Sequence, residues 1–149
     1  MSFCNQNFNW ITENLAVGNI YAGTDLKTLR EHGIDVIVAA TPKLPMNTDV
    51  YSKNGFSLLH VPLLDLPSQN IQQWFKLSNE FIKAHHQIGR KVLVHCMAGI
   101  SRSVTLVAAY LIFHNGWSVD QTIEFIRKGR SCANPNNGFQ MQLDLYRLG

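Results

Sequence analysis

The segment 92–113 constrains this chain most, because it joins an apolar strand to an apolar helix through a short polar loop. The run Val92–Val94 predicts a buried strand, and His95 and Cys96 follow it directly. Arg102 comes after five more residues and opens the apolar helical stretch. Backbone N–H groups of such a loop can converge on one point, and the helix dipole adds positive potential there. The sequence therefore predicts a cradle for a tetrahedral dianion such as phosphate.

Cys96 is the candidate nucleophile of this cradle. A free cysteine has a pKa of about 8.5, and helix N-termini or nearby cations lower such values to roughly 3.5–7.5. Arg102 presents a planar fork of donors that can hold two oxygens of a phosphoryl group. Attack by the thiolate on a phosphate ester would form a phosphocysteine, which water would then hydrolyse. The alternative is a buried, inert cysteine at the end of a strand.

The rest of the chain predicts alternating strands and helices. Apolar runs predict strands at 34–40, 56–64 and 91–95, after a short hairpin over 10–17. Apolar spacing and capping residues predict helices at 25–32 with Thr24 as the cap, 71–88, 102–115, 119–128 and from about 138. Residues 1–8 are expected to be loose, and 41–55 to form a surface loop. This pattern predicts a single α/β domain over residues 1–149, with a central, largely parallel sheet flanked by helices on both faces.

The string His95-Cys96-x5-Arg102-Ser103 resembles the signature of the cysteine-dependent protein tyrosine phosphatases, and its fuller form resembles their dual-specificity branch. The segment 109–112 matches the helix motif of this family. The segments 65–70 and 130–143 resemble the small atypical dual-specificity phosphatases, closest to the JNK-stimulatory-phosphatase-like subgroup. The resemblance implies a protein-tyrosine-phosphatase-like fold with a phosphate-binding loop between strand and helix. It also implies hydrolysis of phosphotyrosine and phosphoserine/phosphothreonine through a phosphocysteine intermediate, with no cofactor and no metal.

The predicted general acid is Asp65, which ends a strand on the same sheet edge as Cys96. The resemblance supports this role, because the family presents its acid on a loop upstream of the signature. Asp49 in the long loop stays open as an alternative acid, and Asp65 could instead cap a turn. The resemblance implies that the Ser103 hydroxyl donates a hydrogen bond to the Cys96 sulfur as the thiolate departs. Alternatively, a serine in the first turn of a helix can satisfy the helix backbone.

The predicted phosphate-binding loop comprises Met97, Ala98, Gly99, Ile100 and Ser101 together with Arg102. None of the first five side chains is charged.

Three further residues have two interpretations each. His95 is predicted to order the loop through hydrogen bonds, or else to be a satisfied core residue. Arg130 is a candidate second anion site beside the pocket, or else a solvated arginine at a helix end. Cys132 could pair with Cys96 under oxidation, or else remain a buried free thiol.

Composition limits the partners. The net charge of +3 and the pI near 8.9 suit anionic substrates but are too weak and scattered to indicate nucleic-acid binding. Three cysteines without disulfide spacing indicate a reducing compartment, so we expect a cytoplasmic or nuclear protein. No apolar span or leader is evident, and Ser2 departs from the Met-Gly start of acylated relatives, so no membrane partner is expected.

The expected partners are phosphorylated proteins, with MAP-kinase pathway components as candidates by resemblance; no oligomeric state is predicted. Two alternatives remain. The same cysteine chemistry could act on a phosphoinositide or an RNA 5′-triphosphate. The chain could also be an inactive phospho-binding module, although that usually requires loss of the cysteine or the arginine.

Overall fold

The computed structural model describes residues 4–149. Residues 1–3, including the Ser2 on which the acylation expectation rests, lie outside the described residues. The strands are β1 (Phe8–Thr12), β2 (Leu15–Gly18), β3 (Ile34–Ala39), β4 (Ser57–His60) and β5 (Lys91–His95). The helices are α1 (Ile20–Thr24), α2 (Leu26–Glu31), α3 (Thr48–Lys53), the 3-10 turn η1 (Gln72–Trp74), α4 (Phe75–Gln87), α5 (Arg102–Asn115), α6 (Val119–Gly129) and α7 (Asn137–Leu148).

The five strands form one sheet in the order β1-β2-β5-β3-β4. β2, β5, β3 and β4 run parallel, and only β1 pairs antiparallel with its neighbour β2. The central strands are continuous apolar runs because helices cover both faces of the sheet. The predicted fold class, a largely parallel sheet between two helical layers, is confirmed.

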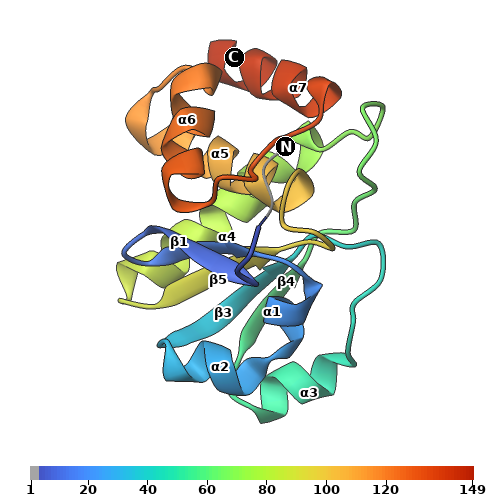
Figure 1. Cartoon of the computed structure of the whole chain (residues 1–149), viewed down its shortest axis with the longest axis vertical. Helices are drawn as coiled ribbons and strands as arrows, with labels where there is room; N and C mark the ends of the chain where they lie inside the picture. Colours follow the sequence, from blue (N-terminus) through green and yellow to red (C-terminus); the bar gives the residue numbers. More distant parts are fainter. Residues whose placement is uncertain (1–3) are drawn as a thin grey trace.

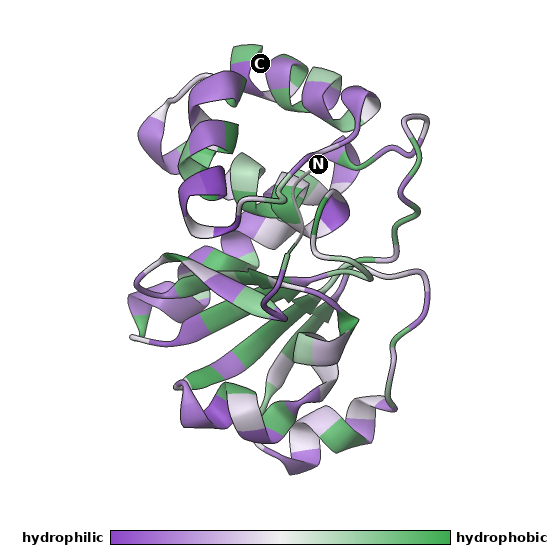
Figure 2. Cartoon of the chain, viewed as in Figure 1, coloured by the Kyte–Doolittle hydropathy of each residue, from purple (hydrophilic) through white to green (hydrophobic). Residues whose placement is uncertain are grey.

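The two helical layers are unequal (Figure 1). α4, α5, α6 and α7 cover one face, and α1, α2 and α3 cover the other. Strand residues alternate between the two cores: Val92 and Val94 face the larger one, whereas Leu93 faces the smaller one. Figure 2 shows apolar residues gathered along the strands and polar residues on the outer helix surfaces.

α5 is the central helix of the larger layer. It spans the predicted residues, and every residue from Ser103 to Ile112 is buried. It contacts α4, α6 and α7 as well as the sheet, so no side of its middle turns faces water. A helix that is apolar nearly all round is expected to be covered on all sides, and this one is.

Several predicted boundaries are wrong at the N-terminal half. α1 was not predicted, and Asp25 rather than Thr24 caps α2, because the Asp25 carboxylate accepts from the Thr28 N–H. The expected surface loop 41–55 contains α3, whose Tyr51 is buried in the smaller core. Both α1 and α3 are one-and-a-half turns long, too short to leave a helical period in the sequence, and packing stabilises them.

The carboxyl ends of the parallel strands lie along one edge of the sheet. His95 pairs in register with Gly18 on one side and Ala39 on the other. Residues that follow these strands therefore meet at that edge, where open α/β sheets bind their ligands.

Candidate active site

Cys96 follows β5 directly and is 2% exposed. Two groups lie within hydrogen-bond distance of its sulfur. The Gly99 N–H donates to Cys96 Sγ over 3.2 Å, and Ser103 Oγ lies 3.1 Å from the same sulfur. A backbone N–H and a hydroxyl therefore converge on the sulfur of the candidate nucleophile.

The loop from Cys96 to Ser101 has every carbonyl bonded to a group outside it. The donors, in order from Cys96 to Ser101, are His95 Nδ1, Ile20 N, Arg130 Nη2, Arg130 Nε, Asn134 N and Thr105 N with its hydroxyl. In a trans peptide the N–H points opposite to the carbonyl. These contacts therefore turn the loop N–H groups toward its interior, which is the geometry of an anion-binding nest.

Gly99 is required at the tightest point of this loop. Its φ is +69°, a conformation that costs a non-glycine residue energy. A Cβ here would also lie 2.6 Å from the Gly18 carbonyl oxygen and 2.7 Å from Arg130 Nη2. The loop can approach β2 this closely only because position 99 has no side chain.

Arg102 is the first residue of α5 and is half-buried beside the loop. Its Nη1 donates to the Leu63 carbonyl over 3.0 Å, which ties α5 to the segment after β4. Its Nε is buried and has no hydrogen-bond partner among the described residues. Buried donors are nearly always paired, so this one is placed to bind a ligand oxygen.

Asp65 lies in the exposed segment after β4, and the C-terminal part of the chain holds it near the loop. Asn136 Nδ2 donates to Asp65 Oδ1 over 3.0 Å, and the Asn136 N–H donates to Ser101 Oγ over 3.0 Å. Asn136 thus links the predicted acid to the predicted phosphate-binding loop. Asp49, the alternative acid, lies in the first turn of α3, in the opposite helical layer (Figure 1).

A model of the dual specificity phosphatase catalytic domain matches residues 15–148. The chain belongs to the dual specificity phosphatase family. It is therefore a cysteine-dependent protein tyrosine/serine/threonine phosphatase whose substrates are phosphorylated proteins. The resemblance inferred from the signature and its flanking segments is confirmed at this level.

Known proteins resemble this phosphatase over nearly its whole length. The chain is 40% identical to the human dual specificity protein phosphatase 22, with 93% of the chain and 72% of that protein covered. It is 40% identical to the tyrosine-protein phosphatase yvh1 of Schizosaccharomyces pombe, over 91% of the chain and 40% of yvh1. The crystal structure of the human tyrosine phosphatase-like serine/threonine/tyrosine-interacting protein superposes with a TM-score of 0.86 at 32% identity, covering 95% of each chain.

His95 lies beneath the phosphatase's loop and is fully buried. Its Nδ1–H donates to the Cys96 carbonyl over 3.2 Å, and its Nε2 has no partner among the described residues. Burial lowers the pKa of the imidazole, the charge of Arg102 acts in the same direction, and the backbone contact opposes them. His95 therefore contacts the loop as a neutral ring at neutral pH.

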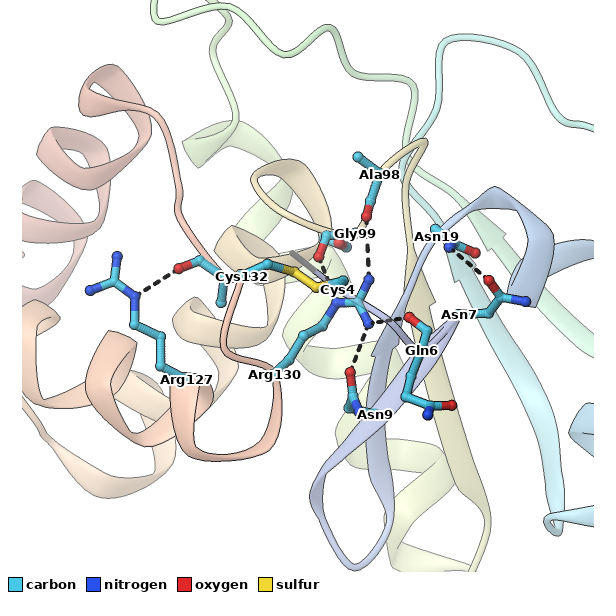
Figure 3. The surroundings of a disulfide bond; sticks show 12 residues. Cys4, Gln6, Asn7, Asn9, Asn19, Ala98, Gly99, Arg127, Arg130 and Cys132 are labelled. Carbon is cyan, nitrogen blue, oxygen red and sulfur yellow. Dashed lines mark hydrogen bonds between the residues drawn. A yellow bond between two sulfur atoms is a disulfide. The ribbon is translucent and has the colours of Figure 1, made fainter. Parts of the chain in front are cut away.

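Arg130 does not lie where either interpretation placed it. Its side chain is 1% exposed, so it is not a solvated helix-end arginine. Its guanidinium donates to the carbonyls of Ala98, Gly99 and Gln6 and to Asn9 Oδ1. Figure 3 shows these contacts converging on the guanidinium. A buried group with this many bonded donors offers no second anion site.

The expectation about the cysteines is also wrong. Cys132 pairs with Cys4 in a disulfide, not with Cys96, and the two Cα atoms lie 5.5 Å apart (Figure 3). Cys96 is the free cysteine. Of the residues expected to be loose, residues 4–8 are held against the loop after α6 by this bond and by the Arg130 contact with Gln6, and residues 1–3 lie outside the described residues. A spacing of 128 residues carries no local sign of such pairing.

Sequence reasoning missed Asn136 and the structural position of Arg130. An asparagine before a helix is a recognisable cap, and Asn136 Oδ1 does accept from the Phe139 N–H. Its contact with Asp65, 71 residues earlier, has no local signal.

No helix among residues 4–149 is both long and apolar enough to cross a bilayer. The same residues contain no cluster of three or more histidine, cysteine or acidic side chains arranged to hold a metal ion.

Proposed function

We propose that Cys96 is the nucleophile, Arg102 the phosphate ligand, Asp65 the general acid and Ser103 the donor to the departing sulfur. The observation that carries this proposal is the convergence of Gly99 N–H and Ser103 Oγ on Cys96 Sγ, in a loop whose carbonyls all face outward. The N–H groups of residues 97–102 would bind the equatorial oxygens of the phosphoryl group, and the Arg102 guanidinium would donate two further hydrogen bonds to them.

In the first step the Cys96 thiolate attacks phosphorus, the S–P bond forms and the ester P–O bond breaks. The leaving alkoxide or phenoxide needs a proton, which protonated Asp65 donates. In the second step Asp65, now a carboxylate, accepts a proton from the attacking water. The S–P bond breaks, and the Ser103 hydroxyl donates to Cys96 Sγ as the thiolate departs.

The loop side chains favour phosphoproteins over phosphoinositides. Met97, Ala98, Ile100 and Ser101 carry no charge, and the scissile phosphate would occupy Arg102. A headgroup with several phosphates needs further cations, since each added dianion must be desolvated and paired. Because Arg130 is buried and bonded, it does not supply one. This arrangement also disfavours an RNA 5′-triphosphate.

We further propose that the physiological substrates are MAP-kinase pathway phosphoproteins. Support comes from the resemblance of segments 65–70 and 130–143 to the JNK-stimulatory-phosphatase-like subgroup.

The test compares wild type and Cys96→Ser on a doubly phosphorylated Thr-x-Tyr peptide, its two single-phosphate versions and a soluble inositol trisphosphate lipid. Wild type should act on the peptides with higher kcat/KM than on the lipid. Cys96→Ser should be inactive while still folded, because serine stays protonated at neutral pH. Turnover by Cys96→Ser would reject the mechanism, and a faster rate on the lipid than on every peptide would reject the substrate class.

A further inference from the structure

Arg130 is buried, charged and hydrogen-bonded to the active-site loop, and the proposed chemistry assigns it no role. It is the C-terminal cap of α6 and lies 28 residues after Arg102, the signature arginine at the start of α5. Its guanidinium donates to the Ala98 carbonyl through Nη2 over 3.3 Å and to the Gly99 carbonyl through Nε over 2.8 Å.

These two carbonyls belong to peptide groups whose N–H ends point into the loop, and one of those N–H groups bonds the candidate nucleophile. The Ala98 carbonyl shares its peptide plane with the Gly99 N–H, which donates to Cys96 Sγ over 3.2 Å. The Gly99 carbonyl shares its plane with the Ile100 N–H. A cation that binds the carbonyl end of a peptide fixes its orientation and strengthens the N–H at the other end as a donor.

We propose that Arg130 is a positioning residue: its guanidinium holds two peptide groups of the phosphate-binding loop so that their N–H groups face the Cys96 thiolate. This inference rests on the proposed role of Cys96 as the nucleophile.

The charge balance supports this role. No carboxylate among the described residues lies within ion-pair distance of Arg130. A buried cation is costly unless a negative charge lies near it, and Cys96 as a thiolate supplies one. Burial lowers the pKa of the Arg130 guanidinium, and the Cys96 charge raises it. The attraction between the Arg130 charge and a negatively charged Cys96 sulfur is mutual.

The N-terminal segment holds the guanidinium from its other side. Arg130 Nη1 donates to the Gln6 carbonyl over 3.0 Å and to Asn9 Oδ1 over 2.8 Å. The disulfide from Cys4 to Cys132 joins the two segments beside these contacts (Figure 3). Arg130 is therefore fixed between the loop and the N-terminal segment and does not rotate toward solvent.

The other charged or titratable groups around the loop do not replace Arg130. Arg102 lies at the start of α5 and is assigned to the substrate. His95, from β5, is kept neutral by burial, which lowers its pKa. Asp65 reaches the loop through Asn136 and is bonded there.

The experiment measures the rate of Cys96 alkylation by iodoacetamide against pH, together with kcat/KM on an aryl phosphate. In Arg130→Met we expect the alkylation midpoint to move to higher pH by about one unit. We expect kcat/KM at neutral pH to fall about tenfold to a hundredfold, less than the loss of a directly bonded donor. Arg130→Lys keeps the charge but cannot bridge two carbonyls, and should give an intermediate shift.

Arg127→Met is the matched control. Arg127 donates to the Ala133 carbonyl and Asn134 Oδ1 in the same segment, and among the described residues no hydrogen bond joins its side chain to residues 96–101. It should keep the wild-type midpoint. Circular dichroism and Tm establish that each variant is folded, and if Arg130→Met does not fold, Arg130→Lys decides.

The proposal is overturned if folded Arg130→Met, or Arg130→Lys, has the same alkylation midpoint as wild type. It is also overturned if Arg127→Met shifts that midpoint as far as Arg130→Met does. Loss of turnover in Cys96→Ser together with an unchanged Arg130 profile rejects the positioning role and leaves the cysteine mechanism standing.

Discussion

His95 shows how one residue can serve the active site without contacting substrate. Its imidazole supports the loop from below through the Cys96 carbonyl. The ring packs directly against Gly23 of α1, where a Cβ would lie 2.4 Å from Nε2. No acceptor reaches Nε2 among the described residues, so protonation would leave a buried, unpaired N–H.

Stability should therefore fall in acid. Burial holds the pKa of His95 below the ordinary value of 6.5. Between that lowered pKa and 6.5 the unfolded chain binds more protons, so the free energy of unfolding rises with pH there. We expect the urea midpoint to decrease from about pH 7 to about pH 5, and to decrease less in His95→Gln. Equal pH dependence in the two proteins, measured by urea denaturation, would contradict this account.

At the scale of elements, α7 positions the segment that carries Asp65. Gln142 Oε1 accepts from the N–H groups of Ile71 and Gln72, and its Nε2 donates to the Gln69 carbonyl. Gly138 lies against Pro67, where a Cβ would come 2.0 Å from the Pro67 carbonyl oxygen. The acid segment has no regular structure of its own, so these contacts with a distant helix set its position.

Gly138→Ala should displace the acid segment without touching the loop of Cys96. Because the general acid matters most when the leaving group is poor, kcat/KM should fall about tenfold to a hundredfold on phosphoserine peptides. It should change little on activated aryl phosphates. Asp65→Asn provides the reference pattern, and Met141→Ala, an exposed position of α7, is the control. An equal loss on both ester types would show that the substitution acts elsewhere.

At the scale of the whole molecule, the first described residues are fastened to the segment after α6. The disulfide closes a loop of 128 residues, and Asn7 adds contacts to Asn19 through its backbone and side chain. A crosslink over so long a separation restricts the unfolded chain strongly. The N-terminal segment therefore contributes to stability as well as to the position of Arg130.

Removing the disulfide should destabilise the phosphatase by about 2–4 kcal/mol. That loss corresponds to a decrease in Tm of roughly 5–15 °C for a chain of this size. Thermal unfolding with and without reductant measures the effect: wild type should lose stability on reduction, and Cys4→Ser should not respond. A wild-type Tm that is insensitive to reductant would contradict the prediction.

The sequence alone determined the parts of the phosphatase that depend on local pattern. The boundaries of β5 and α5 follow from two apolar runs with the Cys96–Arg102 loop between them. The Ser118 cap of α6 follows from its own capping box with Gln121. These features are visible because residues only a few positions apart make the hydrogen bonds that define them.

Only the tertiary structure decided which residues surround the unit of β5, the Cys96–Arg102 loop and α5. The short helices α1 and α3 owe their stability to packing, and their sequences carry no period. Arg130 resembled a surface arginine because neighbouring residues do not reveal that Gln6, 124 positions earlier, would cover it. The pairing of Cys4 with Cys132 and the contact of Asn136 with Asp65 likewise join distant segments. Such pairs form only when the completed fold brings those segments together, so local sequence propensity does not predict them.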